Sequence, residues 1–181
     1  MSRTVTDHGS PDRFIAGTIG LPGDRTFYLQ SRKGSDVQTV VLEKEQVALL
    51  AEKLVELVDE AARTDGGFDD DPATADLDPL ETPLTEAFRV GAFGIGWDTT
   101  EGRVVLEIHA VTDDDEEIPD IGDDGDVGPD CLRVWLTPGA ARAFAARSTS
   151  LVAAGRPPCP FCHLPLDPDG HICPRANGYR R

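Results

Sequence analysis

Basic residues are scarce in this chain of 181 residues, which has 17 Lys and Arg against 33 Asp and Glu and a net charge of −16. Proteins that bind phosphate backbones or anionic membranes need a positive surface, so this balance argues against both classes. Long apolar runs are also missing, because no stretch approaches the roughly 18 residues that a membrane-spanning helix needs. We therefore expect no membrane contact, and nucleic-acid binding is disfavoured.

The first residues lack the apolar segment of a signal peptide, and residues 1–12 are expected to form a flexible, polar N-terminus. Their composition predicts a cytoplasmic location. Cysteine is limited to four residues. Because thiols stay reduced in the cytosol, closely spaced cysteines there indicate metal binding or redox chemistry before they indicate a structural disulfide.

Residues 13–64 predict three strands followed by one helix. The strands are expected at 14–20, 26–30 and 37–42, where short apolar runs are separated by turn-forming residues. A helix should follow, because apolar residues then recur at intervals of three and four. This stripe consists of Val47, Leu50, Ala51, Leu54, Leu57 and Val58.

The same order returns in residues 87–155. Strands are expected at 88–96, 104–111 and 132–136. A helix should begin at Thr137, because threonine is a good N-cap and Pro138 suits the first helical position. Strand 104–111 alternates in polarity, which predicts one buried face and one face that is at least partly exposed to solvent.

A Phe-x-x-Gly-x-x-Gly pattern opens both halves, beginning at Phe14 and at Phe88. We therefore predict an α+β fold with a duplicated strand-strand-strand-helix unit, in which an antiparallel sheet packs with two helices. Chance similarity between common strand and helix patterns is the alternative. Two acidic segments interrupt the units, a linker at 65–86 and a loop at 113–130, and both are expected to be solvated and mobile.

Residues 156–181 carry a cluster of metal-binding side chains. A Cys-Pro-x-Cys pair is followed, after a turn at Asp169-Gly170, by a His-x-Cys pair. Three thiols and one imidazole at this spacing predict a tetrahedral, structural Zn²⁺ site, and so short a segment needs a metal to fold. The expected ligands are Cys159, Cys162, His171 and Cys173.

Two alternatives concern this tail. His163 competes with His171 as the fourth ligand, and we favour His171 because it comes from the opposite arm of the hairpin. A thioredoxin-type redox dithiol is disfavoured, since prolines surround the Cys-x-x-Cys pair and no helix is expected to follow it. Cys131 lies far from this tail in the sequence and is expected to be a small buried residue.

Glu107 and His109 are the only catalytic candidates that we find. They share the polar face of strand 104–111 and precede the acidic loop, so they could bind a divalent cation and activate water. An exposed strand face next to a solvated loop is the favoured interpretation. We therefore assign no catalytic residue and leave open whether the chain is an enzyme.

The stretches 132–138, 155–162 and 167–179 give the chain a family resemblance. It resembles actinobacterial conserved hypothetical proteins that are known as repeat proteins or domains of unknown function, with a C-terminal segment like a zinc ribbon. The likeness extends from Arg13 onward and is most specific in the cysteine-bearing tail. It implies no activity, although neighbouring genes in this family encode a histidine phosphatase and a kinase-like protein.

Three functions follow from these features. The first is a non-enzymatic binding or adaptor protein that contains zinc and holds a protein partner. The second is a metal-assisted hydrolase or phosphoryl-handling enzyme, which requires Glu107 and His109 to converge in a concave site. The third is nucleic-acid binding through the zinc segment and the Arg-rich tail. Oligonucleotide binding that does not change with salt concentration would exclude this function.

Overall fold

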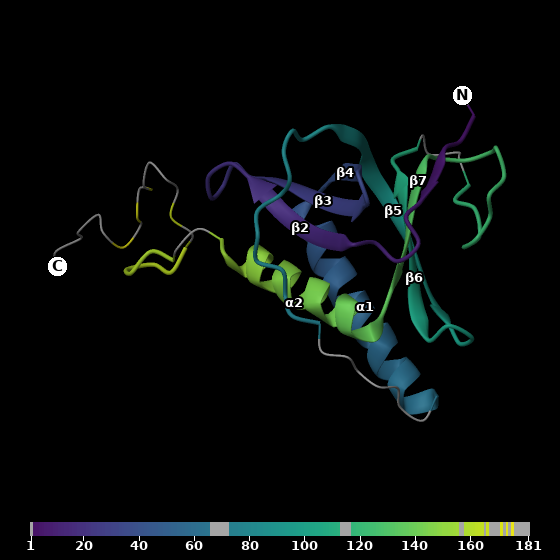
Figure 1. Ribbon diagram of the computed structural model, residues 1–181. Coiled ribbons are helices and arrows are strands. Elements are labelled where there is room, and N and C mark those ends of the chain that lie inside the picture. The colour runs from purple at the N-terminus through teal and green to yellow at the C-terminus, as the bar shows by residue number, and fades with distance from the viewer. Residues whose placement is uncertain are drawn as a thin grey trace.

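Among the residues that the structure describes, seven strands form one mixed sheet and two helices cover one of its faces (Figure 1). This computed structural model describes residues 2–65, 73–112, 117–155, 158–164, 166, 171, 173 and 175. The strands are β1 (Val5–Asp7), β2 (Arg13–Ile19), β3 (Thr26–Lys33), β4 (Asp36–Leu42), β5 (Glu86–Asp98), β6 (Arg103–Ala110) and β7 (Cys131–Leu136). The helices are α1 (Lys44–Thr64) and α2 (Pro138–Ala153). The predicted α+β class is confirmed.

The strand order is β1-β7-β6-β5-β4-β3-β2. Most neighbours are antiparallel, but β4 pairs with β5 in parallel and β1 pairs with β7 in parallel. The prediction of a purely antiparallel sheet is therefore wrong. The parallel junction arises because the chain crosses from β4 to β5 through α1, as parallel strands require a long connection. Each half contributes three antiparallel strands and then a helix, and an origin by duplication stays a prediction.

Both helices begin where the sequence places them. Glu43 and Gln46 form a capping box at the start of α1, and the Thr137 hydroxyl accepts a hydrogen bond from the Ala140 N–H at 3.1 Å at the start of α2. Their apolar stripes pack on the sheet, and the rings of Phe14 in β2 and Phe144 in α2 lie 4.7 Å apart. Neither helix in the described part of the chain is long and apolar enough to cross a bilayer.

The N-terminal residues differ from the flexible segment expected at 1–12. Val5 lies opposite Cys131 in the parallel pairing of β1 with β7. Arg3 is buried, and His8 is buried with its Nδ1 atom 2.8 Å from the Ser31 hydroxyl. Val5–Asp7 thus form a strand at the edge of the sheet.

The acidic linker 65–86 also has a packing role in its described part. Leu80 is buried against the sheet face opposite the helices, together with Ile15, Tyr28 and Val41. Gly17 makes this contact possible, because a Cβ atom there would lie 2.5 Å from Leu80 Cγ. Leu80 therefore anchors this segment on the sheet, while most of residues 73–86 remain exposed.

An ion pair holds this linker in place and makes it sensitive to acid. Arg13 donates to Asp76 at 2.5 and 3.0 Å, and the hydrogen bond lowers the pKa of Asp76 from 3.8 to about 2. Because the folded-state pKa lies below the unfolded one, the stabilisation is present above about pH 4 and is lost as the pH falls toward 2.

We expect Asp76→Asn to lower the free energy of unfolding by about 1 kcal/mol at pH 7, a value reduced for the partial exposure of the pair. The difference from wild type should vanish near pH 2. Urea denaturation at a series of pH values measures it, with Asp78→Asn as the matched control because this neighbouring carboxylate is exposed. Equal losses in the two variants at pH 7 would contradict the assignment.

Candidate functional site

The C-terminal segment brings together the four residues expected to bind zinc. One ligand atom from each of Cys159, Cys162, His171 and Cys173 lies within 4.8 Å of the other three. The Sγ atoms of Cys159 and Cys173 are 3.8 Å apart, and Cys162 Sγ is 3.2 Å from His171 Nε2. Zn–S bonds of about 2.3 Å in a tetrahedron place two sulfurs about 3.8 Å apart. The group can therefore hold a metal ion.

A tight turn presents the first two sulfurs. The His163 N–H donates to the Cys159 carbonyl at 2.9 Å, and the Cys159 N–H donates to the Leu164 carbonyl at 2.8 Å. His163 has φ 61°, the left-handed conformation that closes such a turn. It is a turn residue outside the ligand group, whereas His171 is inside it. The predicted turn at Asp169-Gly170 lies outside the described residues.

Backbone groups of this turn also favour a thiolate. Burial acts to raise the pKa of the Cys159 thiol, but hydrogen bonds from the Cys162 and Phe161 N–H groups bring that pKa below its ordinary value. Since zinc binds the thiolate form, such N–H groups support a metal ligand. The pKa of Cys162 is instead raised: the Leu164 N–H opposes this change, while burial and the neighbouring thiols cause it.

The structure forms a second group from Glu107, His109 and Cys131. Glu107 and His109 lie on β6 and Cys131 lies opposite His109 on β7, with one ligand atom from each within 4.8 Å of the others. All three are buried, with exposed fractions of 0%, 0% and 1%. The expectation that Glu107 and His109 share an exposed strand face is therefore wrong. The expectation that Cys131 is buried is confirmed.

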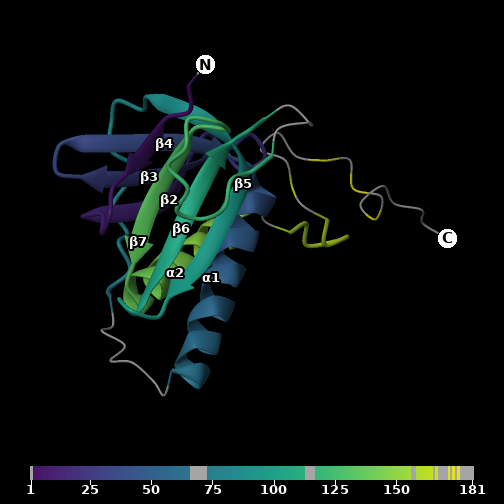
Figure 2. The ribbon, with the colours of Figure 1, turned by 90° about the vertical axis from the view of Figure 1, so that its right-hand side faces the viewer.

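The acidic loop causes this burial. Its described part, residues 117–130, crosses β6 and β7 on the face turned away from the helices (Figure 2). The Gly122 N–H donates to Glu107 Oε1 at 2.9 Å, and Arg3 Nη1 donates to the Asp123 carbonyl at 2.8 Å. Arg133 Nη1 contacts Asp124 at 2.8 Å. These bonds attach the segment to the sheet, while most of residues 117–130 are exposed, as expected for a solvated loop.

Glycines on β5 make room for the loop. A Cβ atom at Gly94 would lie 3.1 Å from Ile121 Cγ1, and one at Gly96 would lie 3.3 Å from Ile121 Cδ1. The Gly94-x-Gly96 spacing puts both glycines on one face of the strand, since side chains alternate. This spacing is the sequence signal for a covered face. The bulge at Val90/Ala92 does place Gly91 at an irregularity.

Arg3 and Arg133 lie beside the group of Glu107, His109 and Cys131, and the sequence did not point to them. Arg133 Nε donates to Glu107 Oε1 at 2.6 Å, and Arg3 Nε donates to the Pro129 carbonyl at 3.1 Å. Burial alone would lower the pKa of Arg133, but hydrogen bonds to Glu107 and Asp124 raise it. Glu107 and Arg133 therefore form a buried, charged pair.

The other two members of the group favour their neutral forms. Burial lowers the pKa of His109, with Arg3 and Arg133 acting in the same direction and Glu107 acting against them. Burial, followed by the charge of Glu107, raises the pKa of Cys131 to about 11. At neutral pH and without a metal, the group contains a neutral imidazole and a protonated thiol beside the ion pair.

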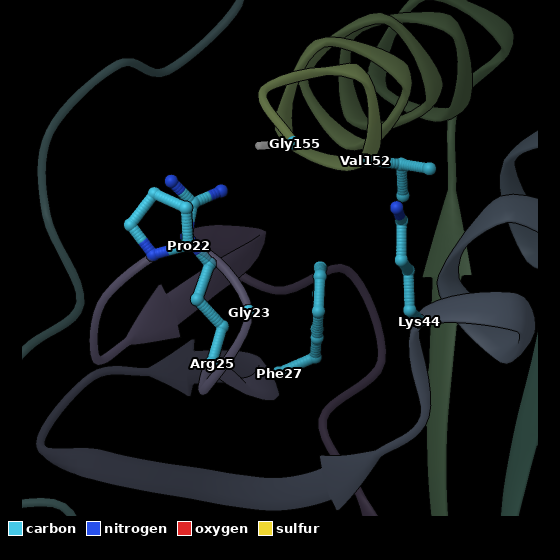
Figure 3. A pocket seen from close by; sticks show the side chains of 7 residues that line it. All are labelled: Pro22, Gly23, Arg25, Phe27, Lys44, Val152 and Gly155. Atoms are coloured by element: carbon cyan, nitrogen blue, oxygen red, sulfur yellow. The ribbon is translucent and has the colours of Figure 1, made fainter. Parts of the chain in front are cut away.

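A separate cleft of about 230 Å³ lies where α2 ends (Figure 3). Arg25 and Lys44 flank it, and Arg25 also donates to the Ala154 carbonyl at 2.5 Å. The residues that line this cleft include no carboxylate, imidazole or thiol. It therefore offers the positive charges of Arg25 and Lys44.

Fold and site together define an α+β protein with a candidate metal centre in its C-terminal segment. The chain belongs to the family described as "Protein of unknown function (DUF3090)", whose model matches residues 6–173. This match agrees with the resemblance to a domain of unknown function, and it identifies neither an organism nor a repeat. No curated protein matches the chain, and no solved structure matches it either.

Proposed function

We propose that this protein is a non-enzymatic binding or adaptor protein whose tail is held by a structural zinc ion. The observation that carries the proposal is the closed set of four donors, with Cys159 and Cys173 sulfurs 3.8 Å apart. Three thiolates and one imidazole fill a tetrahedral shell, so no position remains for a substrate or an activated water molecule. A site of this type stabilises a fold and does not perform chemistry.

The burial of Glu107 and His109 supports the same proposal. A hydrolase that activates water at these residues needs a concave site open to its substrate. Both side chains are 0% exposed beneath residues 117–130. In this state of the protein a substrate cannot reach them, which disfavours the hydrolase and phosphoryl-handling alternatives.

The expected partner is a protein with a basic surface. The net charge of −16 attracts such a surface and repels phosphate backbones. The Arg-rich tail offered as a nucleic-acid contact lies mostly outside the described residues. Its described member, Arg175, donates to the Phe161 carbonyl at 3.4 Å, within the metal-binding segment.

Metal analysis of reduced, dialysed protein tests the zinc assignment. We expect the Cys159→Ser/Cys173→Ser variant to contain one zinc equivalent less than wild type, because each cysteine supplies one of four ligands. His171→Gln should weaken binding at least tenfold, whereas His163→Gln, the matched control, should leave it unchanged. Equal zinc contents in the double variant and wild type would contradict the proposal.

Co-purification tests the adaptor role. The intact protein is isolated from its native extract, and bound proteins are identified by mass spectrometry, with phosphate-ester and peptide hydrolysis assayed in parallel. We expect a basic protein whose retention weakens as salt rises, because the attraction is electrostatic. Hydrolysis that depends on Glu107 would contradict a non-enzymatic role.

A further inference from the structure

The buried group on the outer face of β6 and β7 has three donor types that zinc accepts. It offers a carboxylate from Glu107, an imidazole from His109 and a thiol from Cys131, with ligand atoms within 4.8 Å of one another. Cross-strand pairing explains this closeness, because His109 lies opposite Cys131 and Glu107 is two residues away on the same face. The sheet itself, and not a mobile loop, therefore fixes the three donors.

Several polar atoms of this group are buried without a hydrogen-bond partner. These atoms are Glu107 Oε2 and both ring nitrogens of His109. Oε2 lies 3.3 Å from His109 Nε2, close enough for an ion pair but not aligned as a hydrogen bond, and His109 Nδ1 has no such neighbour. Leaving such atoms unsatisfied costs about 1–3 kcal/mol each, and buried groups of this kind call for an explanation. A cation bound between them would satisfy both side chains.

The surrounding contacts prepare Glu107 as a ligand. Arg133 and the Gly122 N–H both bind Oε1, at 2.6 and 2.9 Å, and so direct Oε2 towards His109. Hydrogen bonds that fix the second oxygen of a carboxylate are typical of the shell around a metal ligand. Asp124 and Asp7 contact the same Arg133, at 2.8 and 3.5 Å, and reduce its repulsion of a cation.

The charges of the group also fit a divalent ion. When the exposed carboxylates of Asp7 and Asp124 are counted with the buried Glu107, carboxylates outnumber the guanidinium groups of Arg3 and Arg133 by one. When a metal displaces the proton of Cys131, the thiolate adds a second negative charge. One divalent cation then balances the group.

We propose that Glu107, His109 and Cys131 bind a second Zn²⁺ ion, beneath residues 117–130. The mixed oxygen, nitrogen and sulfur donors favour zinc over magnesium or calcium, which take oxygen ligands. Three protein ligands would leave the fourth tetrahedral position to a water molecule enclosed beneath residues 117–130. This site is independent of the C-terminal centre, because the two share no ligand.

The test counts metal in the full-length protein and in variants of each group. Wild type should bind two zinc equivalents, and Cys159→Ser/Cys173→Ser should keep one. Adding Cys131→Ala to this tail variant should remove the remaining equivalent, while adding His163→Gln, which alters no proposed ligand, should not. Co²⁺ substitution in the tail variant should give a thiolate-to-metal charge-transfer band that Cys131→Ala abolishes.

A tail variant that stays folded by circular dichroism but binds no zinc overturns the proposal. So does a bound equivalent whose Co²⁺ spectrum lacks a thiolate band. The tail variant alone decides the question if the Cys131 variant fails to fold. If instead the C-terminal group binds no zinc, the pattern of zinc contents differs. Wild type would then bind one equivalent, which the tail variant would keep and Cys131→Ala would lose.

Discussion

Replacing Arg133 by methionine is expected to lower the free energy of unfolding by about 3–5 kcal/mol, the range for breaking a buried ion pair from one side. Arg133 contacts Glu107 at 2.6 Å, and Glu107 is 0% exposed. Without the guanidinium, the buried Glu107 carboxylate keeps the hydrogen bond from the Gly122 N–H but loses its cationic partner, so a buried charge is left uncompensated. Urea denaturation in the presence of a chelator measures the loss without a contribution from metal.

The converse variant, Glu107→Gln, should cost less than Arg133→Met. Arg133 retains Asp124 at 2.8 Å and Asp7 at 3.5 Å after this change, and glutamine keeps the size of the side chain. The double variant Glu107→Leu/Arg133→Met should recover most of the loss, because paired apolar residues can replace a buried ion pair. A loss below about 1 kcal/mol in Arg133→Met would show that the pair is not buried in solution.

Local patterns predicted the helices and most of the strands. The spacing of Leu50, Leu54 and Val58 fits α1, and Thr137-Pro138 marks the start of α2. These signals succeed because they depend on neighbours three or four residues away. The parallel pairing of β4 with β5 was missed because it depends on how α1 returns the chain across the sheet, which no local pattern records.

Sequence reasoning failed for Glu107 and His109 for a related reason. Charged residues that alternate with apolar ones ordinarily face water, so burial was not expected. What buries them is a polar segment that binds through its backbone, including the Gly122 N–H and the Asp123 carbonyl. Two signals pointed to it: Arg133 opposite Glu107 in a strand, and two glycines spaced to accept Ile121.

The four residues of the C-terminal Cys/His group could be brought together from the sequence because the spacing of metal-binding residues is a local and selective signal. Thiols at Cys159 and Cys162 need a tight turn, and His171 with Cys173 must come from elsewhere to complete a tetrahedron. Residue spacing did not distinguish His171 from His163 by itself. The left-handed φ of 61° at His163 explains why this residue lies outside the ligand group and His171 lies inside it, because His163 closes the turn.

Loss of the tail zinc should have the largest energetic effect, and the effect should be local. Structural zinc contributes about 10–16 kcal/mol of apparent binding free energy. The described part of the tail has little apolar packing to replace it, since Phe161 and Leu164 are 61% and 53% exposed. We therefore expect Cys173→Ser to open the turn around Cys159, while the sheet and helices keep their melting temperature to within about 2 °C.

Limited proteolysis with chymotrypsin measures this opening at Phe161. Cleavage should be at least tenfold faster in Cys173→Ser than in wild type, and a chelator should raise the wild-type rate to the same level. His163→Gln is the matched control and should remain resistant, because this residue lies outside the ligand group. Resistance of Cys173→Ser equal to that of wild type would mean that packing holds the tail. A large fall in the melting temperature would mean that the metal supports the whole fold. Either result would contradict a zinc ion that stabilises the tail alone.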